Sequence, residues 1–273
     1  MTVSLRPKYS FRVPVNAQSI SSGTFGSKTI EEIKALKVWE GNKQRSLGEL
    51  FEVSGENGRT PTEVSIRIFG DVHKVKRIGE EMSGGEIIIE GDAGMHLGEK
   101  MKGGKIIVSG DAGSWLGAMM KGGSIAVRGN AGDYVGAAYR GSTEGMRGGT
   151  IIIHGNVGNE VGCFMRNGLI KIYGNAGQFV GMHMRNGTIF VRGDSDGRAG
   201  ASMIGGKIVL LGSAASVLPT FTIDSVKKKV EVDGEEVQGP FYLFTGDIAE
   251  KGKGKLYIAQ TRNKDLSRYE KYL

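Results

Sequence analysis

A short glycine-rich unit recurs seven times along the chain and constrains its fold more than any other feature. The units begin at these glycines: Gly70, Gly91, Gly110, Gly129, Gly155, Gly174 and Gly193. Four of the six intervals between them are 19 residues, while the first unit carries two extra residues and the fourth carries seven. Seven units with one short period are typical of a solenoid, in which each unit contacts only its neighbours.

The residue types at fixed positions of the unit, counted without the extra residues, predict its local structure. Position 16 is always isoleucine, and position 18 is isoleucine, valine or leucine. Residues two apart on a strand lie on the same face, so these positions predict a short strand with both side chains inward. Position 11 is always methionine, which we expect to fill the core. Glycine at positions 1, 8 and 14 suits corners and close contacts between units. Aspartate or asparagine at position 2 suits a turn held by its own side chain.

These positions together predict an all-β protein. Its central part, residues 70–212, is expected to be a right-handed parallel β-helix (solenoid) of about seven 19-residue coils. Stacked coils would lie about 4.8 Å apart, the distance between paired strands. Both ends of such a stack expose unpaired edges, so we expect capping segments over residues 1–69 and 213–273.

The two capping segments contain patterns of their own. Thr29 and Glu32 form a capping box that predicts a short helix, and residues 37–47 read as a hairpin that turns at Gly41. The second segment contains a hairpin turn at 233–234, strands over 241–244 and 255–259, and a charged tail from residue 261. Together they predict a helix and strands for residues 1–69 and strands plus a tail for 213–273.

Composition excludes several classes of protein. The 46 glycines come with only five prolines and no collagen-like period. No apolar run is long enough to span a membrane, and the start of the chain lacks a signal-peptide pattern, so we expect a cytoplasmic protein.

The net charge of +7 favours acidic partners. No zinc finger, RNA-binding aromatic motif or recognition helix supports nucleic acid as that partner, and the glycine spacing does not match a phosphate-binding loop.

Neither cysteine nor histidine forms a recognisable site. The single cysteine, Cys163, cannot hold an iron–sulfur cluster and is expected to be buried. The four histidines occupy unrelated positions of the unit: His73, His96, His154 and His183. A zinc site needs three or four converging ligands. We therefore expect no catalytic, cofactor-binding or metal-binding residue in this chain.

Five stretches of the sequence carry a family resemblance. They are KTIEEIKALKVWEG, LGELFEVSGE, GDVHKVKRIGEEMSGGEI, DAGSWLG and GNAGDYVGAAYRGSTEGMRGGTIIIHGN, the last with its insertion in the fourth unit. Through them the chain resembles the C subunit of formylmethanofuran dehydrogenase over nearly its whole length. The resemblance implies a non-catalytic scaffold in a cytoplasmic complex that reduces CO2 to formylmethanofuran, a reaction of methanogenesis and one-carbon metabolism. It also implies that partner subunits carry a molybdo- or tungstopterin, a binuclear metal site and iron–sulfur clusters.

Two alternatives remain open from the sequence. The repeat alone is similar to the C-terminal domain of the glutamate synthase large subunit, so a stand-alone scaffold domain of that type is one alternative. Parallel β-helices also include polysaccharide lyases, so a carbohydrate-active enzyme is the other. Such an enzyme would require a cluster of basic and carboxylate residues in a groove, and the sequence shows none.

Two rows of residues remain that folding alone does not explain. The basic ladder occupies position 12 in consecutive units: Lys102, Lys121, Arg147, Arg166 and Arg185. The outward row occupies position 17, between the two inward positions: Ile88, Ile107, Ala126, Ile152, Lys171, Phe190 and Val209. We expect the apolar members of the outward row to be covered by a capping segment or by partner subunits. Two interpretations of the basic ladder stay open. It is either a solvated charged flank or a contact for an acidic partner, and for the second the resemblance implies a candidate in the anionic, glutamyl-containing tail of methanofuran.

Overall fold

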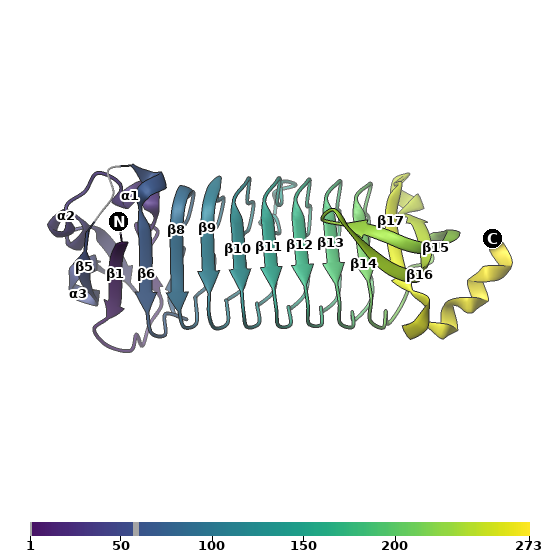
Figure 1. Cartoon of the computed structure of the whole chain (residues 1–273), viewed down its shortest axis with the longest axis horizontal. Helices are drawn as coiled ribbons and strands as arrows, with labels where there is room; N and C mark the ends of the chain where they lie inside the picture. The colour runs from purple at the N-terminus through teal and green to yellow at the C-terminus, as the bar shows by residue number, and fades with distance from the viewer. Residues whose placement is uncertain (1, 57–59) are drawn as a thin grey trace.

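One long sheet runs through most of the molecule (Figure 1). The computed structural model describes residues 2–56 and 60–273. Seven strands of this sheet belong to the repeat: β8 (Ser83–Glu90), β9 (Gly103–Val108), β10 (Ser124–Val127), β11 (Thr150–Ile153), β12 (Leu169–Ile172), β13 (Thr188–Val191) and β14 (Lys207–Leu210). They lie side by side in chain order and pair in parallel. The prediction of a β-protein with one strand per unit is confirmed.

The register of the seven strands aligns equivalent positions of neighbouring units. Ile125 of β10, for example, lies opposite Ile106 of β9 and Ile151 of β11. A second row of single parallel bridges joins the units at position 3, beginning with Val72 opposite Ala93 and ending with Ser195 opposite Ala214. Each unit is therefore joined to its neighbours along at least two separate lines.

Further strands extend the sheet at both ends. At the N-terminal end these are β6 (Ser65–Phe69), β1 (Thr2–Pro7) and β5 (Phe51–Gly55). At the C-terminal end they are β17 (Gly254–Ala259), β16 (Glu235–Gly246) and β15 (Thr222–Val232). β6 and β17 pair in parallel with the repeat strands, whereas β5, β15 and β16 pair antiparallel with their neighbours. The pairing of the repeat thus continues beyond residues 70–212 on both sides.

A second, four-stranded sheet lies in the N-terminal part. Its strands are β4 (Lys43–Ser46), β3 (Lys37–Glu40), β2 (Val15–Asn16) and β7 (Val75–Lys76) in spatial order. The helices are short: α1 (Ser22–Phe25), α2 (Ile30–Lys34), α3 (Leu47–Leu50) and the 3₁₀ helices η1 (Pro61–Glu63), η2 (Ile248–Glu250), η3 (Gln260–Arg262) and η4 (Lys264–Tyr272).

Most of the local predictions for the two ends are confirmed. Thr29 and Glu32 form the capping box of α2, and β3 and β4 form the hairpin that turns at Gly41. The turn at Asp233 joins β15 to β16, and β17 matches the strand predicted over residues 255–259. The tail is the exception, because residues 264–272 form η4, which buries Leu266 against the core.

The interior is filled as the repeat predicts. The seven methionines of position 11 and the seven isoleucines of position 16 are at most 1% exposed. The glycine at position 8 turns the chain toward this core with a positive φ, 65° at Gly98. A Cβ added to Gly98 would lie 2.5 Å from Cδ1 of Ile125, so a side chain there would collide with the core of the neighbouring unit. Both backbone and space require glycine at this corner.

The side chains at position 2 form different hydrogen bonds from the ones predicted. Asp71 does accept a hydrogen bond from the backbone of its own turn, at His73. From the second unit onward, however, the side-chain oxygen accepts from the backbone N–H of position 2 in the next unit. Asp92 Oδ1 lies 2.8 Å from the nitrogen of Asp111, and the pattern continues through Asp111, Asn130, Asn156, Asn175 and Asp194. These side chains therefore join neighbouring units, in place of the local turn that the residue type alone suggested.

Candidate interaction site

The outward row, on the sheet face opposite the core, is divided into a covered part and a bare part. The hairpin β15–β16 crosses the front of the sheet over β13 and β14 (Figure 1). Beneath it, Phe190 is 7% exposed and Val209 is fully buried. They form a small apolar cluster with residues of the hairpin and neighbouring strands: Leu169, Val230, Val232, Phe241 and Ala259. The chain thus covers the C-terminal part of the row with its own capping segment.

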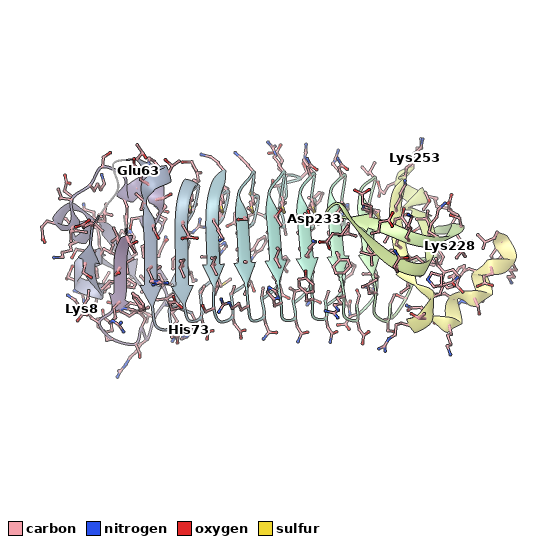
Figure 2. The ribbon with its side chains drawn as sticks, in the orientation of Figure 1. Lys8, Glu63, His73, Lys228, Asp233 and Lys253 are labelled. Atoms are coloured by element: carbon pink, nitrogen blue, oxygen red, sulfur yellow. The ribbon has the colours of Figure 1, made fainter. Side chains whose placement is uncertain are left out.

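Lys171, the charged member of the outward row, marks the edge of this covered part. Its Nζ lies 2.6 Å from Oδ2 of Asp233 at the hairpin turn, which Figure 2 shows over the middle of the sheet. The lysine side chain is only 11% exposed. The hydrogen bond to Asp233 raises the pKa of Lys171 above its ordinary value, despite the opposing effect of burial. The ammonium group therefore stays charged and anchors the turn.

The N-terminal part of the row is bare. Ile88, Ile107, Ala126 and Ile152 are all partly exposed, and Figure 1 shows no element in front of β8 to β11. Charged pairs flank the strip at its N-terminal end, where Lys105 lies 3.6 Å from Glu86. The result is a strip of three isoleucines and one alanine, continuous with the part that the hairpin already covers. A contiguous apolar strip on a protein surface is typical of an interaction site.

The basic ladder is also placed on the surface, but its five members differ in their partners. Lys102 Nζ lies 3.1 Å from Oε2 of Glu81, and Arg147 forms an ion pair with Glu144 in the insertion. Nε of Arg166 donates to the carbonyl of Thr143 at 3.2 Å. Lys121 and Arg185 are exposed and form no ion pair or hydrogen bond through their side chains within residues 2–56 and 60–273. Whether the ladder binds an anion remains a prediction.

The remaining polar residues singled out in the sequence lie apart from one another. His154 stacks on Tyr173 and His183 on Phe164, while His73 contacts Asp71. Cys163 is buried as predicted, and burial raises the pKa of its thiol to about 12. In the part of the chain that the structure describes, no group of three or more histidine, cysteine, aspartate or glutamate side chains is placed to hold a metal ion.

One buried polar cluster is not among the features that the repeat predicted. Glu99 is fully buried, and its Oε2 accepts hydrogen bonds from Arg77 at 2.9 Å and from the hydroxyl of Tyr139. The same hydroxyl lies 2.7 Å from Nδ1 of His96. Burial would raise the pKa of Glu99, but the hydrogen bonds and the charge of Arg77 outweigh it and lower this pKa to about 2. Tyr139 belongs to the insertion of the fourth unit, so that segment reaches back across two units.

A signal for this cluster was present in the sequence. Position 9 holds small or apolar residues from the third unit onward, namely Ala118, Ala137, Cys163, Met182 and Ala201. The first two units hold Glu80 and Glu99 at the same position. A carboxylate in an otherwise apolar column needs partners, because burial of an unpaired charge is costly. The column predicts a polar cluster, although it does not identify Tyr139 as a member.

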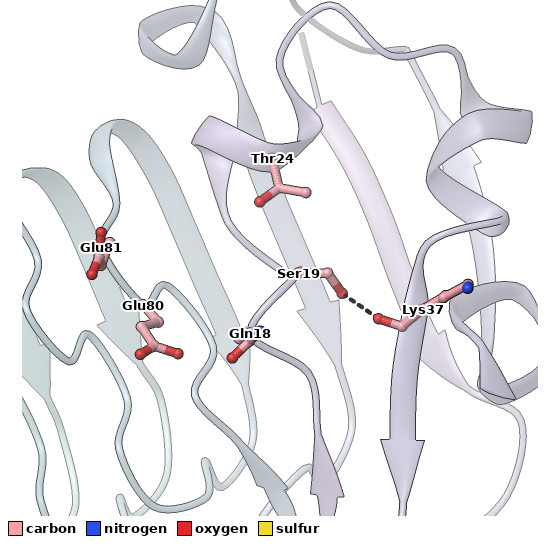
Figure 3. Close-up of a pocket in the computed structure, with 6 residues that line it drawn as sticks. All are labelled: Gln18, Ser19, Thr24, Lys37, Glu80 and Glu81. Carbon is pink, nitrogen blue, oxygen red and sulfur yellow. Dashed lines mark hydrogen bonds between the residues drawn. The ribbon is translucent and has the colours of Figure 1, made fainter. Parts of the chain in front are cut away.

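A pocket of about 440 Å³ lies between the N-terminal segment and the first unit (Figure 3). Gln18, Ser19, Thr24 and Lys37 line one side, and Glu80 and Glu81 line the other. Both carboxylates already have partners within the chain, since Glu80 pairs with Arg77 and Glu81 with Lys102. Neither carboxylate of this pocket is therefore free to bind a ligand.

Comparison with known proteins identifies the class of this repeat protein. No family model matches the chain. The C subunit of a tungsten-containing formylmethanofuran dehydrogenase 2 from Methanococcus maripaludis is 48% identical over 261 residues, covering 93% of this chain and 95% of that protein. The C subunit of a molybdenum-containing formylmethanofuran dehydrogenase 1 from Methanosarcina barkeri is 47% identical over 95 residues. That alignment spans 35% of this chain and about a third of the relative, 32%.

A solved structure shares the fold of this chain. The match is to a chain in the crystal structure of the formyltransferase/hydrolase complex from Methylorubrum extorquens, in complex with methylofuran. Its TM-score is 0.83, and the two chains are 29% identical. The match covers 94% of this chain and 99% of that chain. The fold is thus that of a chain in this formyltransferase/hydrolase complex. The chain belongs to the family of formylmethanofuran dehydrogenase C subunits.

Proposed function

We propose that this chain is a non-catalytic scaffold subunit of a formylmethanofuran dehydrogenase complex that reduces CO2 to formylmethanofuran. The observation that carries the proposal is the full-length relative, which is 48% identical over 95% of its own length. The bare strip supports it, because an apolar face that continues beyond the chain's own hairpin suits a permanent partner. Family membership favours this function over the carbohydrate-active enzyme and the stand-alone glutamate-synthase-type domain.

The scaffold we propose is a right-handed parallel β-helix. The in-register parallel strands and the second row of bridges at position 3 support stacked coils. Residues 70–212 would form the regular stack, and residues 1–69 and 213–273 would cap it. The strands that continue the sheet at each end support this division, since they leave no repeat strand with an open edge.

We assign the redox chemistry of the complex to other subunits. These would carry a molybdo- or tungstopterin, a binuclear metal site and iron–sulfur clusters, in line with the molybdenum- and tungsten-containing enzymes named among the relatives. The single cysteine of this chain is buried, and four cysteines are the usual ligands of one cluster. No helix in the described part of the chain is long and apolar enough to cross a membrane, and we place the complex in the cytoplasm.

Two surfaces would contact partners. The bare strip would pack against another subunit, and the basic ladder would bind carboxylates of a subunit or of the methanofuran tail. Lys121 and Arg185 are the ladder members best suited to the second role, because neither forms an ion pair with a carboxylate among residues 2–56 and 60–273. The five residues cover four coil steps, about 19 Å at the usual strand spacing. That length suits an extended anionic segment.

Affinity isolation of the chain from its native source tests this proposal. We expect pterin- and iron–sulfur-containing subunits to co-purify, with molybdenum or tungsten in the eluate. The chain produced alone is expected to be colourless and free of stoichiometric tungsten, molybdenum, zinc and iron. A chain that purifies alone from its source, or that cleaves polysaccharide, would overturn the scaffold role.

A further inference from the structure

A second pocket, of about 400 Å³, lies where the four-stranded sheet meets the first units of the repeat. Strands β2 and β3 contribute Asn16 and Trp39, β7 contributes Lys76, and the corners of the first two units contribute Arg77 and His96. Its volume falls within the range of small-ligand sites, about 300 to 1,000 Å³. No residue of this pocket belongs to the basic ladder or to the outward row.

The aromatic side of the pocket is open. The chain has two tryptophans, and one of them, Trp39, is 46% exposed. The other, Trp115, is stacked on Tyr134 with 4.3 Å between ring centroids. A large exposed aromatic ring in a concave site supplies apolar contact area for a ligand.

The cationic side of the pocket has one unpaired charge. Nη1 of Arg77 is 2.9 Å from carboxylate oxygens of both Glu80 and Glu99, so its charge is offset within the chain. Lys76 is partly buried and has no ion pair or side-chain hydrogen bond within the described residues. An ammonium group without a carboxylate partner favours an anion nearby.

Hydrogen bonds and ring contacts hold the wall around this charge in place. Arg77 is held by fully buried Glu99, which also receives the hydroxyl of Tyr139. His96 is fixed by contact with the same hydroxyl and stacks on Trp115 with centroids 6.1 Å apart. Arg77 and His96 also hold a positive φ, 65° and 63°, which is uncommon for residues other than glycine. Such preorganised groups lower the cost of binding a ligand.

We propose that this pocket binds a monovalent carboxylate attached to an aromatic or apolar body. The carboxylate would contact Lys76, and the body would lie against Trp39. One unpaired cation matches a single negative charge, which favours a carboxylate over a phosphate dianion. The ligand could be a small free acid or an acidic side chain of another protein. The proposal does not depend on the scaffold role.

Two-dimensional NMR of the full chain, labelled with 15N, tests the proposal through the indole N–H signals of Trp39 and Trp115. The first probe is phenylacetate, with phenylacetamide as its uncharged counterpart. The second is a blocked peptide, acetyl-Gly-Glu-Phe-Gly-amide, with the same peptide carrying glutamine as its counterpart. We expect at least one acid to shift the Trp39 signal saturably while its uncharged counterpart does not. A response to phenylacetate alone assigns the site to free acids, and a response to the peptide alone assigns it to a protein segment.

Lys76→Gln is expected to weaken the binding of the responding acid about tenfold, as the loss of one charge-assisted hydrogen bond predicts. Lys253→Gln is the matched control, since it removes the same charge from an exposed site at the opposite end of the molecule (Figure 2). The control should bind like the unaltered chain. The proposal is overturned if neither acid shifts Trp39, if the uncharged probes bind equally, or if both variants behave alike.

Discussion

Lys171 and Asp233 are 62 residues apart in the chain, yet Nζ of the lysine lies 2.6 Å from Oδ2 of the aspartate. This ion pair ties the turn of the hairpin β15–β16 to the outward face of β12. It also explains why a lysine interrupts an otherwise apolar row. The covered part of the face lies on the C-terminal side of this pair, and the bare part lies on the N-terminal side.

Asp233→Asn is expected to destabilise the chain by about 1 to 3 kcal/mol, because it leaves the largely buried Lys171 without its carboxylate. Asparagine tolerates the positive φ of 58° at this position, so the turn itself should persist. Urea unfolding followed by circular dichroism measures the change. Glu236→Gln is the control, because it breaks the pair between Glu236 and Lys229, whose side chains are both more than half exposed. An exposed pair contributes about 0 to 1 kcal/mol. Equal effects of the two substitutions would contradict the anchoring role of Lys171.

Glu99 is expected to make the stability of the chain depend on pH in the acidic range. Its pKa is about 2 in the folded protein and 4.5 when unperturbed. Because the folded value is the lower one, the ionised group stabilises the fold above pH 4.5, and this contribution is lost as the pH falls toward 2. Glu99→Gln should lower stability at neutral pH by about 1 to 3 kcal/mol. It should also lose less stability than the unaltered chain between pH 4.5 and 2. Parallel pH profiles of the two chains would show that Glu99 does not titrate in this way.

Cys163 is expected to be inert while the chain is folded. Burial raises its pKa to about 12, so almost no thiolate is present at neutral pH. A thiol reagent such as dithionitrobenzoate should react with one thiol per chain in urea and with almost none in buffer. Rapid reaction of the native chain would mean that this part of the repeat opens readily.

The basic ladder is expected to contribute to assembly through its two unpaired members. The double variant Lys121→Gln, Arg185→Gln should bind its partner more weakly. Its binding should also depend less on salt, because fewer attractions between opposite charges remain for salt to screen. The control Lys253→Gln, Lys255→Gln removes the same charge from exposed positions at the C-terminal end. Binding measured at low and high salt should separate the two variants. Identical salt dependence in both would leave the ladder as a solvated surface.

The repeat determines much of the fold because its information is local. Isoleucine at position 16, methionine at position 11 and glycine at position 8 each identify a face or a corner, and the structure places them accordingly. Contacts between distant segments are different. The sequence shows a hairpin that turns at Asp233 but not that this turn lies over Lys171. It likewise shows an insertion but not that Tyr139 reaches Glu99, 40 residues away. Periodicity cannot position segments that do not repeat.

We propose that this subunit binds a partner through the bare strip of the outward row. The most direct test is co-purification of the assembled complex when Ile107 is replaced by glutamate. Ile107 points away from the core, so Ile107→Glu should leave the isolated chain within about 1 kcal/mol of its normal stability. Ile248→Glu is the control, because Ile248 is 53% exposed and lies outside both the outward row and the position of the basic ladder. We predict that Ile107→Glu abolishes co-purification of the partner subunits while Ile248→Glu retains it. Full assembly of the Ile107→Glu chain would contradict this proposal.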